Sequence, residues 1–448
     1  MNISEKLLFF SDEINSHILS GNYPKFIKHI IRFISRKSFL SLADQAVVSA
    51  ANFITGVIVG RCCTKEGFGL YMLGFSIILF VYDMQISLFA TPYMVHSPRL
   101  KGKDLAEYTG SVLIHQIFFS VIIVFLLFIG WMALKSGFGP EGLSPVILTL
   151  TAVICFIMLR EFIRRICFAR MFMGTALILD TAAAFFQLGG LLFLMYLGVL
   201  SVWVVFLAAG IACFVAGMAW LILGRTIYRF SAKRISSDFF RGWSFGKWVF
   251  ASGVLWAVSM NIYPWFLVTF HGAASTGVWA ACIGVVSVIN PVFSGVQNYL
   301  GPKIATVFAQ NGADALKKFV IRANVIFLAF TLVFCIVLFF AGEKIAVFIY
   351  GGGYTGTGAA ITVLGVSLLA GTVGFIFSRV LFAMERADID FAVNFAALFV
   401  LLAAGITMVR AWGPFGAALG MACSNIISSG IRCAVAFNLL GKNAKAAE

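Results

Sequence analysis

Four long apolar stretches of the chain carry polar side chains at helical spacing. In the first stretch, residues 42–61, one helical face carries Gln45, Ser49, Asn52 and Gly56. The stretch 68–92 carries Ser76, Asp83, Gln85 and Ser87, and the stretch 247–270 carries Ser252, Trp256, Ser259, Asn261 and Tyr263. The stretch 275–300 carries Asn290, Ser294, Gln297 and Asn298. Within hydrocarbon such groups are costly unless they face water or protein. For Asn and Asp we favour the lining of a water-accessible cavity, whereas Ser and Gly alone are typical of helix packing.

Two ionisable residues are candidates for a charged site. Asp83 is the one carboxylate deep within the first two stretches, and it suits a cation or proton site, a salt bridge or a contact to a substrate hydroxyl. Arg379 lies inside the stretch 357–381. It could be the counter-ion of Asp83, bind an anionic group such as phosphate, or extend to the lipid headgroups. The sequence does not decide whether the two residues meet.

Two further charges are expected to be structural. Asp180 lies a few helical turns from Arg164, Arg165 and Arg170, which predicts a local ion pair. Arg432 lies close to one end of the last apolar stretch, so we expect its side chain to reach the headgroups.

Pro264 and Pro291 interrupt two of the polar-lined stretches. Proline removes a backbone hydrogen bond and kinks a helix. The two prolines are therefore candidate hinges, and static packing of bent helices explains them equally well.

Motifs of enzymes and metal sites are absent from the sequence. It contains no GxxxxGK[ST], HExxH or GxSxG pattern and no acidic metal cluster, and its nine cysteines include no CxxC pair. We therefore expect neither catalysis nor a metal or other cofactor.

The composition places these residues in a bilayer. The 448-residue chain is 61% hydrophobic and 11% charged, whereas a soluble domain is about 25% charged. Apolar runs long enough to cross hydrocarbon number about 12. They cover 42–61, 68–92, 110–134, 144–163, 173–196, 201–223, 247–270, 275–300, 320–342, 357–381, 389–409 and 414–437.

The chain has a net charge of +15, and its basic residues lie mainly in the connections between spans. This placement is typical of a membrane-topology signal rather than of a nucleic-acid-binding surface. With a cytosolic N-terminus, nearly all Lys and Arg fall on the cytosolic side. The residues left at the outer ends are Arg61, Lys65, Lys135, Lys344 and Arg410. This distribution predicts that both termini are cytosolic.

Weak recurrences relate the two halves of the chain. Gly277-Val-Trp279 repeats Gly69-Leu-Tyr71, and Asn394 lies in its span where Asp180 lies in an earlier one. We therefore predict an all-α polytopic membrane protein with two related six-helix bundles around a central cavity. The expected parts are a basic amphipathic N-terminal extension at 1–38, a first lobe at 39–225, a cytosolic linker at 226–246, a second lobe at 247–440 and a cytosolic tail at 441–448.

Four segments resemble one family. They are SLADQAVVSAANFITGVIVGR followed by EGFGLYMLG, REFIRRICFAR with ALILD at 160–180, GEKIAVFIYGGGYTGTGAAITVLG at 342–365, and GPFGAALGMACSNIISS at 413–429. Over roughly residues 40–440 the chain resembles the polysaccharide (Wzx-like) flippases of the multidrug/oligosaccharidyl-lipid/polysaccharide (MOP) exporter superfamily.

This resemblance implies that the chain moves a polyprenyl-diphosphate-linked oligosaccharide from the cytosolic to the outer leaflet of a bacterial inner membrane by alternating access. Lipid II flippases of the superfamily carry arginines in the first, second and eighth spans. Because this chain has only Arg61 there, another glycan is favoured. The phosphate contact would then fall to Arg379 or to rim cations at Arg164, Arg165 and Lys303.

Two other functions stay open at this stage. One is an efflux antiporter of the MATE type for small cationic compounds, coupled to H+ or Na+ at Asp83. The other is a scaffold that transports nothing and holds a glycan polymerase or glycosyltransferases in a membrane complex. Cavity mutations would abolish efflux in the first case and be silent in the second.

Overall fold

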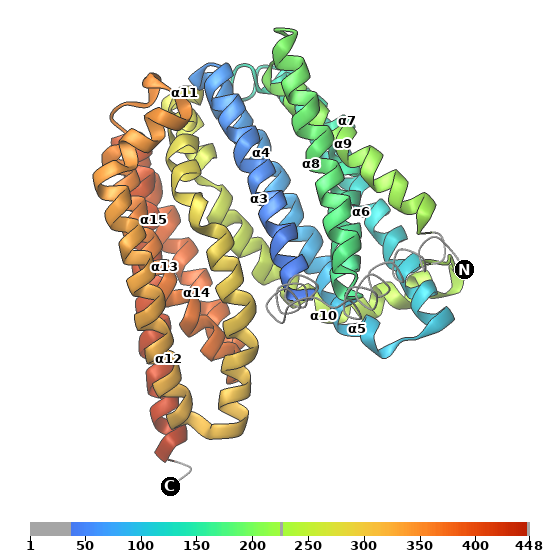
Figure 1. Cartoon of the computed structure of the whole chain (residues 1–448), viewed down its shortest axis with the longest axis vertical. Helices are drawn as coiled ribbons and strands as arrows, with labels where there is room; N and C mark the ends of the chain where they lie inside the picture. The colour runs from blue at the N-terminus through green and yellow to red at the C-terminus, as the bar shows by residue number, and fades with distance from the viewer. Residues whose placement is uncertain (1–36, 225–226, 446–448) are drawn as a thin grey trace, which may run out of the picture. The chain divides into compact units, whose positions relative to one another are not determined.

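The chain is helical throughout the part that the structure describes. A computed structural model describes residues 37–224 and 227–445, and no β-strand occurs in those ranges (Figure 1). A helix satisfies every internal backbone group within its own segment, which is what hydrocarbon requires of apolar runs of this length. The predicted N-terminal extension lies, but for its last two residues, outside the described residues.

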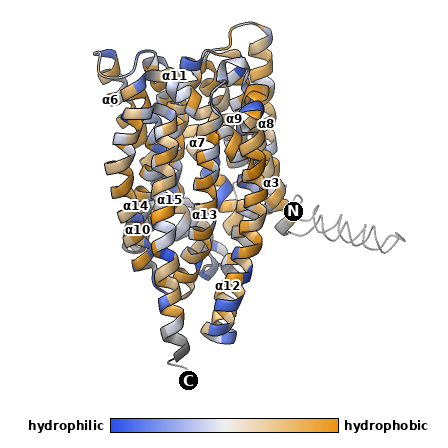
Figure 2. Ribbon diagram, turned by 90° about the vertical axis from the view of Figure 1, so that its left-hand side faces the viewer, coloured by the Kyte–Doolittle hydropathy of each residue, from blue (hydrophilic) through white to orange (hydrophobic). Residues whose placement is uncertain are grey.

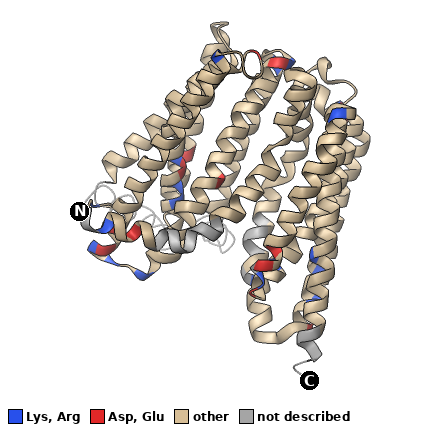
Figure 3. Ribbon diagram, turned by 180° about the vertical axis from the view of Figure 1, so that it is seen from behind, with Lys and Arg blue, Asp and Glu red and all other residues tan. Residues whose placement is uncertain are grey.

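Ten helical stretches within the described residues are long and apolar enough to cross a membrane. They cover Phe39–Cys62, Lys65–Arg99, Gly102–Lys135, Leu143–Ala169, Met173–Tyr196, Val202–Leu223, Phe250–Ser294, Lys303–Tyr350, Gly358–Ala383 and Asp388–Gly441. Their surfaces are mostly apolar, and charges gather in a few places only (Figures 2 and 3). The chain is therefore a multi-pass membrane protein, as predicted.

Three of these stretches contain a chain reversal, and in two of them the helix on each side of the reversal is long enough to cross a membrane. The backbone leaves helical geometry at Gly272 (φ 77°) and Gly413 (φ 55°). The rings of Tyr263 and Trp279, on either side of Gly272, have centroids 5.6 Å apart, whereas a straight helix would separate the residues by about 24 Å. Each of the two stretches thus supplies two crossing segments, which reconciles ten stretches with the 12 spans expected from the sequence.

The contacts divide the chain into two compact units. Of the described residues, the first comprises those up to 55 and those between 78 and 253, and the second comprises 56–77 and those from 254 to 445. The helices of the first part of the chain are α3 (Lys37–Cys62), α4 (Lys65–Gln85), α5 (Thr91–His96), α6 (Gly102–Lys135), α7 (Leu143–Ala169), α8 (Met173–Tyr196), α9 (Val202–Leu223) and α10 (Ala232–Asn261). The end of α3 and the start of α4 pack with the second unit, whereas the sequence places them in the first lobe.

The second unit is built from α11 (Tyr263–Val286), α12 (Asn290–Tyr350), α13 (Gly358–Ala383), α14 (Ala387–Val400) and α15 (Ile406–Lys445). Its α12 also reverses, at Gly312 (φ 75°), since the rings of Phe293 and Phe327 lie 4.7 Å apart (Figure 1). Helix α13 packs against both α12 and α15. Their shared core contains Leu316, Val320, Ile376, Val380 and Ala436.

Both candidate hinge prolines lie in the first turn of a helix. Pro264 follows a break at Ile262 and begins α11, and Pro291 begins α12 after a 3-10 turn at Ser287–Ile289. Proline suits this position because the first-turn N–H groups have no partner within the helix. The sequence thus identified two helix breaks, and the hinge role stays a prediction.

The recurring glycines of the two halves contact each other within the second unit. A Cβ added at Gly69 of α4 would collide with the carbonyl oxygen of Ala273, and one added at Gly277 of α11 would collide with that of Lys65. Lys65 and Ala273 precede the two glycines by the same interval, so the crossing is two-fold symmetric. Small residues allow such a close backbone approach in membrane helices.

We predict that Gly69→Ala and Gly277→Ala each destabilise the folded protein by about 1–3 kcal/mol, because a methyl group would force the two backbones apart. Thermal unfolding in detergent measures the effect. Gly56→Ala is the matched control, since nothing lies within 4 Å of a Cβ at Gly56. Equal melting temperatures for all three variants would contradict the proposed tight crossing.

Candidate functional site

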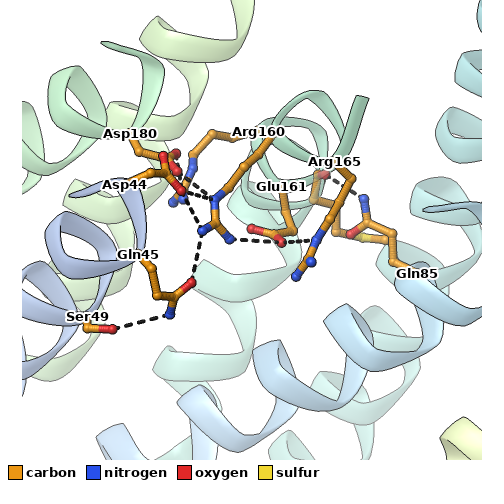
Figure 4. A network of polar contacts seen from close by, with 10 residues as sticks. Asp44, Gln45, Ser49, Gln85, Arg160, Glu161, Arg165 and Asp180 are labelled. Atoms are coloured by element: carbon orange, nitrogen blue, oxygen red, sulfur yellow. Dashed lines mark hydrogen bonds and ion pairs between the residues drawn. The ribbon is translucent and has the colours of Figure 1, made fainter. Parts of the chain in front are cut away.

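A cluster of buried charges joins three helices of the first unit. It contains Asp44 of α3, Glu161 and Arg164 of α7 and Asp180 of α8 (Figure 4). Arg164 lies 2.7 Å from Asp44, 2.7 Å from Asp180 and 3.5 Å from Glu161. The side chains of both aspartates are fully buried. A fixed planar guanidinium suits such multiple contacts, and the ion pairs hold α3, α7 and α8 together.

Two neighbouring arginines balance the remaining negative charge of this cluster. Arg160 lies 2.9 Å from Asp180, and Arg165 lies 2.8 Å from Glu161. Three carboxylates therefore face three guanidinium groups, and the cluster is neutral. The predicted ion pair of Asp180 with Arg164 is confirmed. The structure places Arg164 inside this cluster, while Arg165 stays partly exposed, at 31% of its side chain.

The other first-unit candidates differ in their surroundings. Asn52 is exposed on α3, and Asp83 is partly buried on α4. Gln85 is buried, and its amide donates a 2.9 Å hydrogen bond to the carbonyl of Met158 in α7. That contact is a helix-packing interaction, because it satisfies a backbone group of another helix. The stripe formed by Gln45 and Ser49 leads from α3 to the charged cluster, since Gln45 accepts a 3.2 Å hydrogen bond from Arg164.

A polar crevice lies within the second unit, between α10, α11, α14 and α15. Its volume is about 40 Å³, which is room for a few water molecules. Three members of the polar stripe predicted for 247–270 line it, namely Trp256, Ser259 and Tyr263. The hydroxyl of Tyr263 is buried and has no hydrogen-bond partner among the described residues. Asn394, Ser424, Asn425, Ser428 and Arg432 complete the polar lining.

Arg432 is held inside the second unit by α14. Its Nε donates a 2.8 Å hydrogen bond to Asp390, and its terminal nitrogen donates a 2.5 Å bond to Asn394. The residue is only 9% exposed. The expectation that Arg432 extends to the headgroups is therefore wrong, because an acidic partner one helix away was available. The sequence analysis missed Asp390, which lies close to the start of α14.

Arg379 of α13 carries a charge without an ion-pair partner. Its guanidinium lies over the rings of Phe375 and Phe382, at 5.1 and 5.9 Å from their centroids. Its Nε is buried and forms no hydrogen bond with any described residue. Asp390 attracts it electrostatically, but within the described ranges no carboxylate lies within the 4.0 Å of an ion pair. Asp390 thus compensates Arg432 by direct contact and Arg379 only at longer range.

The two units differ in the partners of two equivalent arginines. Arg164 in α7 and Arg379 in α13 lie equally far from the first residues of their helices. Asp180 in α8 and Asn394 in α14 likewise correspond. Where the first unit has a carboxylate to pair with its arginine, the second has a neutral amide. The second unit therefore keeps an uncompensated cation, which is the chemistry of an anion site.

The remaining candidates are dispersed. Asn261 donates a 2.9 Å hydrogen bond to Ala257 of its own helix, and Asn290 and Lys303 are exposed. The side chains of Gln297 and Asn298 lie outside the described residues. Asp83 belongs to the first unit and Arg379 to the second, so their pairing stays a prediction. No group of three His, Cys, Asp or Glu side chains suited to a metal ion occurs in the described residues.

We predict that Arg164→Gln destabilises the protein by about 3–5 kcal/mol, because it leaves buried carboxylates without a cation. Arg386→Gln is the matched control. Arg386 pairs with Asp388 at 3.0 Å on an exposed turn, where solvent screens the ion pair and its loss should change stability little. Thermal unfolding in detergent compares the two.

Addition of Asp180→Asn to Arg164→Gln should restore part of the lost stability, since it removes one unpaired negative charge. A double variant that is less stable than Arg164→Gln alone would contradict the assignment of charge balance to this cluster.

Comparison with solved structures shows the fold. The chain is similar to a multidrug resistance MATE family transporter of the MOP superfamily in its inward-facing conformation, with a TM-score of 0.73 and 13% identity over 91% of this chain and all of that one. It is similar to a MOP superfamily transporter from Pyrococcus furiosus, with a TM-score of 0.66 and 12% identity over 91% of this chain and 95% of the other. A point mutant of a Vibrio cholerae MATE transporter gives a TM-score of 0.63 and 15% identity over 91% of this chain and 96% of the other.

The sequence comparisons complete this assignment. No curated protein sequence matches the chain. Residues 34–298, more than half of its length, match the family described as polysaccharide biosynthesis protein. The fold and this match confirm the resemblance found in the sequence. The chain has the fold of the MOP superfamily transporters to which it is similar, and it belongs to the polysaccharide biosynthesis protein family.

Proposed function

We propose that the protein is a flippase that moves a polyprenyl-diphosphate-linked oligosaccharide from the cytosolic to the outer leaflet of a bacterial inner membrane. The observation that carries this proposal is the match of residues 34–298 to the polysaccharide biosynthesis family in a chain with a transporter fold. A membrane transporter in such a pathway acts on the glycan or its lipid-linked precursor. Both termini are cytosolic in this proposal, as the distribution of Lys and Arg predicts.

The charge of the second unit suits an anionic substrate. Arg379 is partly buried, stacks on two aromatic rings and lacks a carboxylate partner among the described residues. A guanidinium in this state offers strong charge-assisted hydrogen bonds to a phosphate, because it gives up little to other protein groups. We therefore assign the diphosphate contact to Arg379, with the exposed Lys303 of the same unit as a further cation.

The neutral polar residues suit the sugar. A glycan presents many hydroxyl groups, each of which needs a hydrogen-bond partner in a site from which water is displaced. Asn261, Tyr263 and Asn290 would supply part of these partners, and the lipid chain would stay in the bilayer. Alternating access, with helix breaks at Pro264 and Pro291, would then carry the glycan across.

Deletion of the gene tests this function. We expect the surface glycan to disappear and complete lipid-linked repeat units to accumulate on the cytosolic leaflet, because assembly continues while translocation stops. The measurement is glycan staining together with mass spectrometry of extracted polyprenyl-diphosphate intermediates. Normal glycan in the deletion strain would refute the proposal.

The wild-type gene should restore the glycan, and Arg379→Ala should restore less than about a tenth of it, since the lost diphosphate contact is charge-assisted. Arg379→Lys should recover part of the activity, because a positive charge remains. Arg386→Ala, at an exposed arginine beyond the end of α13, is the matched control and should complement fully. If Arg379→Ala restored as much glycan as the control variant, the assignment of the diphosphate contact to Arg379 would be refuted.

An ion-coupled efflux antiporter is the second candidate, favoured by the similarity to MATE transporters. In the first unit, Asp44, Glu161 and Asp180 are each paired with an arginine. Asp83 is therefore the candidate carboxylate for binding the coupling ion. That function predicts proton- or sodium-dependent drug resistance that Asp83→Asn abolishes. Resistance assays in the deletion strain, complemented with wild type or Asp83→Asn, distinguish the two functions.

A further inference from the structure

An apolar groove runs along α12, between the two arms of this helix. Val292 and Val296 of the first arm and Phe319, Ala323, Ile326 and Phe330 of the second arm line it. We call these residues the α12 groove. Its volume is about 610 Å³, within the range of small-molecule sites. Val292, Ile326 and Phe330 are 42%, 65% and 48% exposed, so the groove lies open at the side of the helix pair.

The floor of the groove is firm because it belongs to the core of the second unit. Phe319, Ala323 and Val296 pack against the buried cluster that contains Leu316, Val320 and Ile376. The second arm borders the groove from Phe319 to Phe330, about 17 Å of helix at the usual rise. The groove therefore has the shape of a slot for an extended chain rather than for a compact ligand.

One end of the groove is basic. Arg322 is the charged residue of its lining, and exposed Lys318 lies one helical turn nearer the bend at Gly312. Residues four apart share a helix face, so the two cations lie on the same side of the second arm. Asp314 lies one further turn toward the bend, and with Lys317 this segment stays positive. Hydrophilic residues gather at this lower end of α12 (Figure 2).

Apolar character alone would not select a ligand here. Lipid tails are as apolar as the groove, so a chain gains little by leaving the bilayer for it. Selection must come from the fit of the chain to the branched and aromatic lining and from the head group at Arg322 and Lys318. Those two requirements together describe an amphiphile with a strongly anionic head and a long, branched apolar chain.

We propose that the α12 groove binds the prenyl chain of a polyprenyl-diphosphate lipid, with the diphosphate at Arg322 and Lys318. This inference rests on the proposed function for its choice of lipid. In the predicted topology the bend of α12 is cytosolic, which is the side on which the lipid-linked glycan would arrive. The groove would thus hold the lipid anchor outside the helical bundle while the glycan occupies the polar site.

Photo-crosslinking of the purified full chain tests this proposal. The protein is placed in phosphatidylcholine nanodiscs with a diazirine-bearing polyprenyl diphosphate that carries no sugar, and labelled peptides are mapped by mass spectrometry. We expect labels on peptides from 292–300 and 319–330. Ala323→Trp fills the groove and should reduce this labelling about tenfold. Ala329→Trp, at an exposed position on another face of the same arm, is its matched control.

Charge variants test the head-group contact. Because they leave the packing of the groove unchanged, we expect these variants to fold normally. Arg322→Gln with Lys318→Gln should weaken labelling about tenfold, because a diphosphate contact is charge-assisted. Lys344→Gln, at an exposed site far along the same arm, should leave labelling unchanged. An excess of polyprenyl diphosphate without the diazirine should reduce the labelling, and an excess of phosphatidic acid should not.

Two results would overturn the proposal. One is labelling spread over the exposed helices without preference for the groove. The other is equal labelling of the same peptides by a diazirine-bearing phosphatidylcholine, which would make the groove a site for ordinary bilayer lipid. Failure of the proposed function is separate, since it is measured as normal surface glycan after gene deletion. Lost glycan combined with absent groove labelling would refute this inference alone.

Discussion

A charge within hydrocarbon must be compensated close by, and this constraint organises both units of the protein. In the first unit, Arg164 meets Asp44 and Asp180 at 2.7 Å each, and the surrounding residues complete a neutral cluster that joins α3, α7 and α8. In the second unit, Asp390 compensates Arg432 and leaves Arg379 without an ion-pair partner among the described residues. Removal of one member of such a buried pair is costly, so the clusters also fix how the helices pack.

The two units therefore differ in what they can do, although their helices correspond. A neutral, fully paired cluster is suited to holding a helix bundle as one body. An arginine without an ion-pair partner, in a unit that also holds a polar crevice, is suited to an anionic, hydroxyl-rich substrate. At the positions equivalent to Arg164 and Asp180 the second unit has Arg379 and Asn394, and no carboxylate among the described residues forms an ion pair with Arg379. The α12 groove, which has basic residues at one end, is the proposed binding site for the lipid part of the same substrate.

The sequence predicted the fold well, because length and hydropathy alone determine which segments can cross a bilayer. The helix breaks at Pro264 and Pro291 and the ion pair of Asp180 were also readable, since proline chemistry and short helical spacing are local. The partners Asp44 and Asp390 were missed because they lie near span ends and act across helices distant in sequence. Gln85 illustrates the same limit, since nothing local indicated its bond to the backbone of α7.

The most direct test of the central claim is translocation by the purified protein in liposomes. A polyprenyl-diphosphate-linked oligosaccharide is placed in the inner leaflet, and its arrival outside is detected by a membrane-impermeant glycosidase. The account predicts transfer with the wild type and with Arg386→Ala and little transfer with Arg379→Ala. The account would be contradicted if folded and correctly inserted wild-type protein gave no more transfer than protein-free liposomes. Unimpaired transfer by Arg379→Ala would contradict the assignment of the diphosphate contact to Arg379.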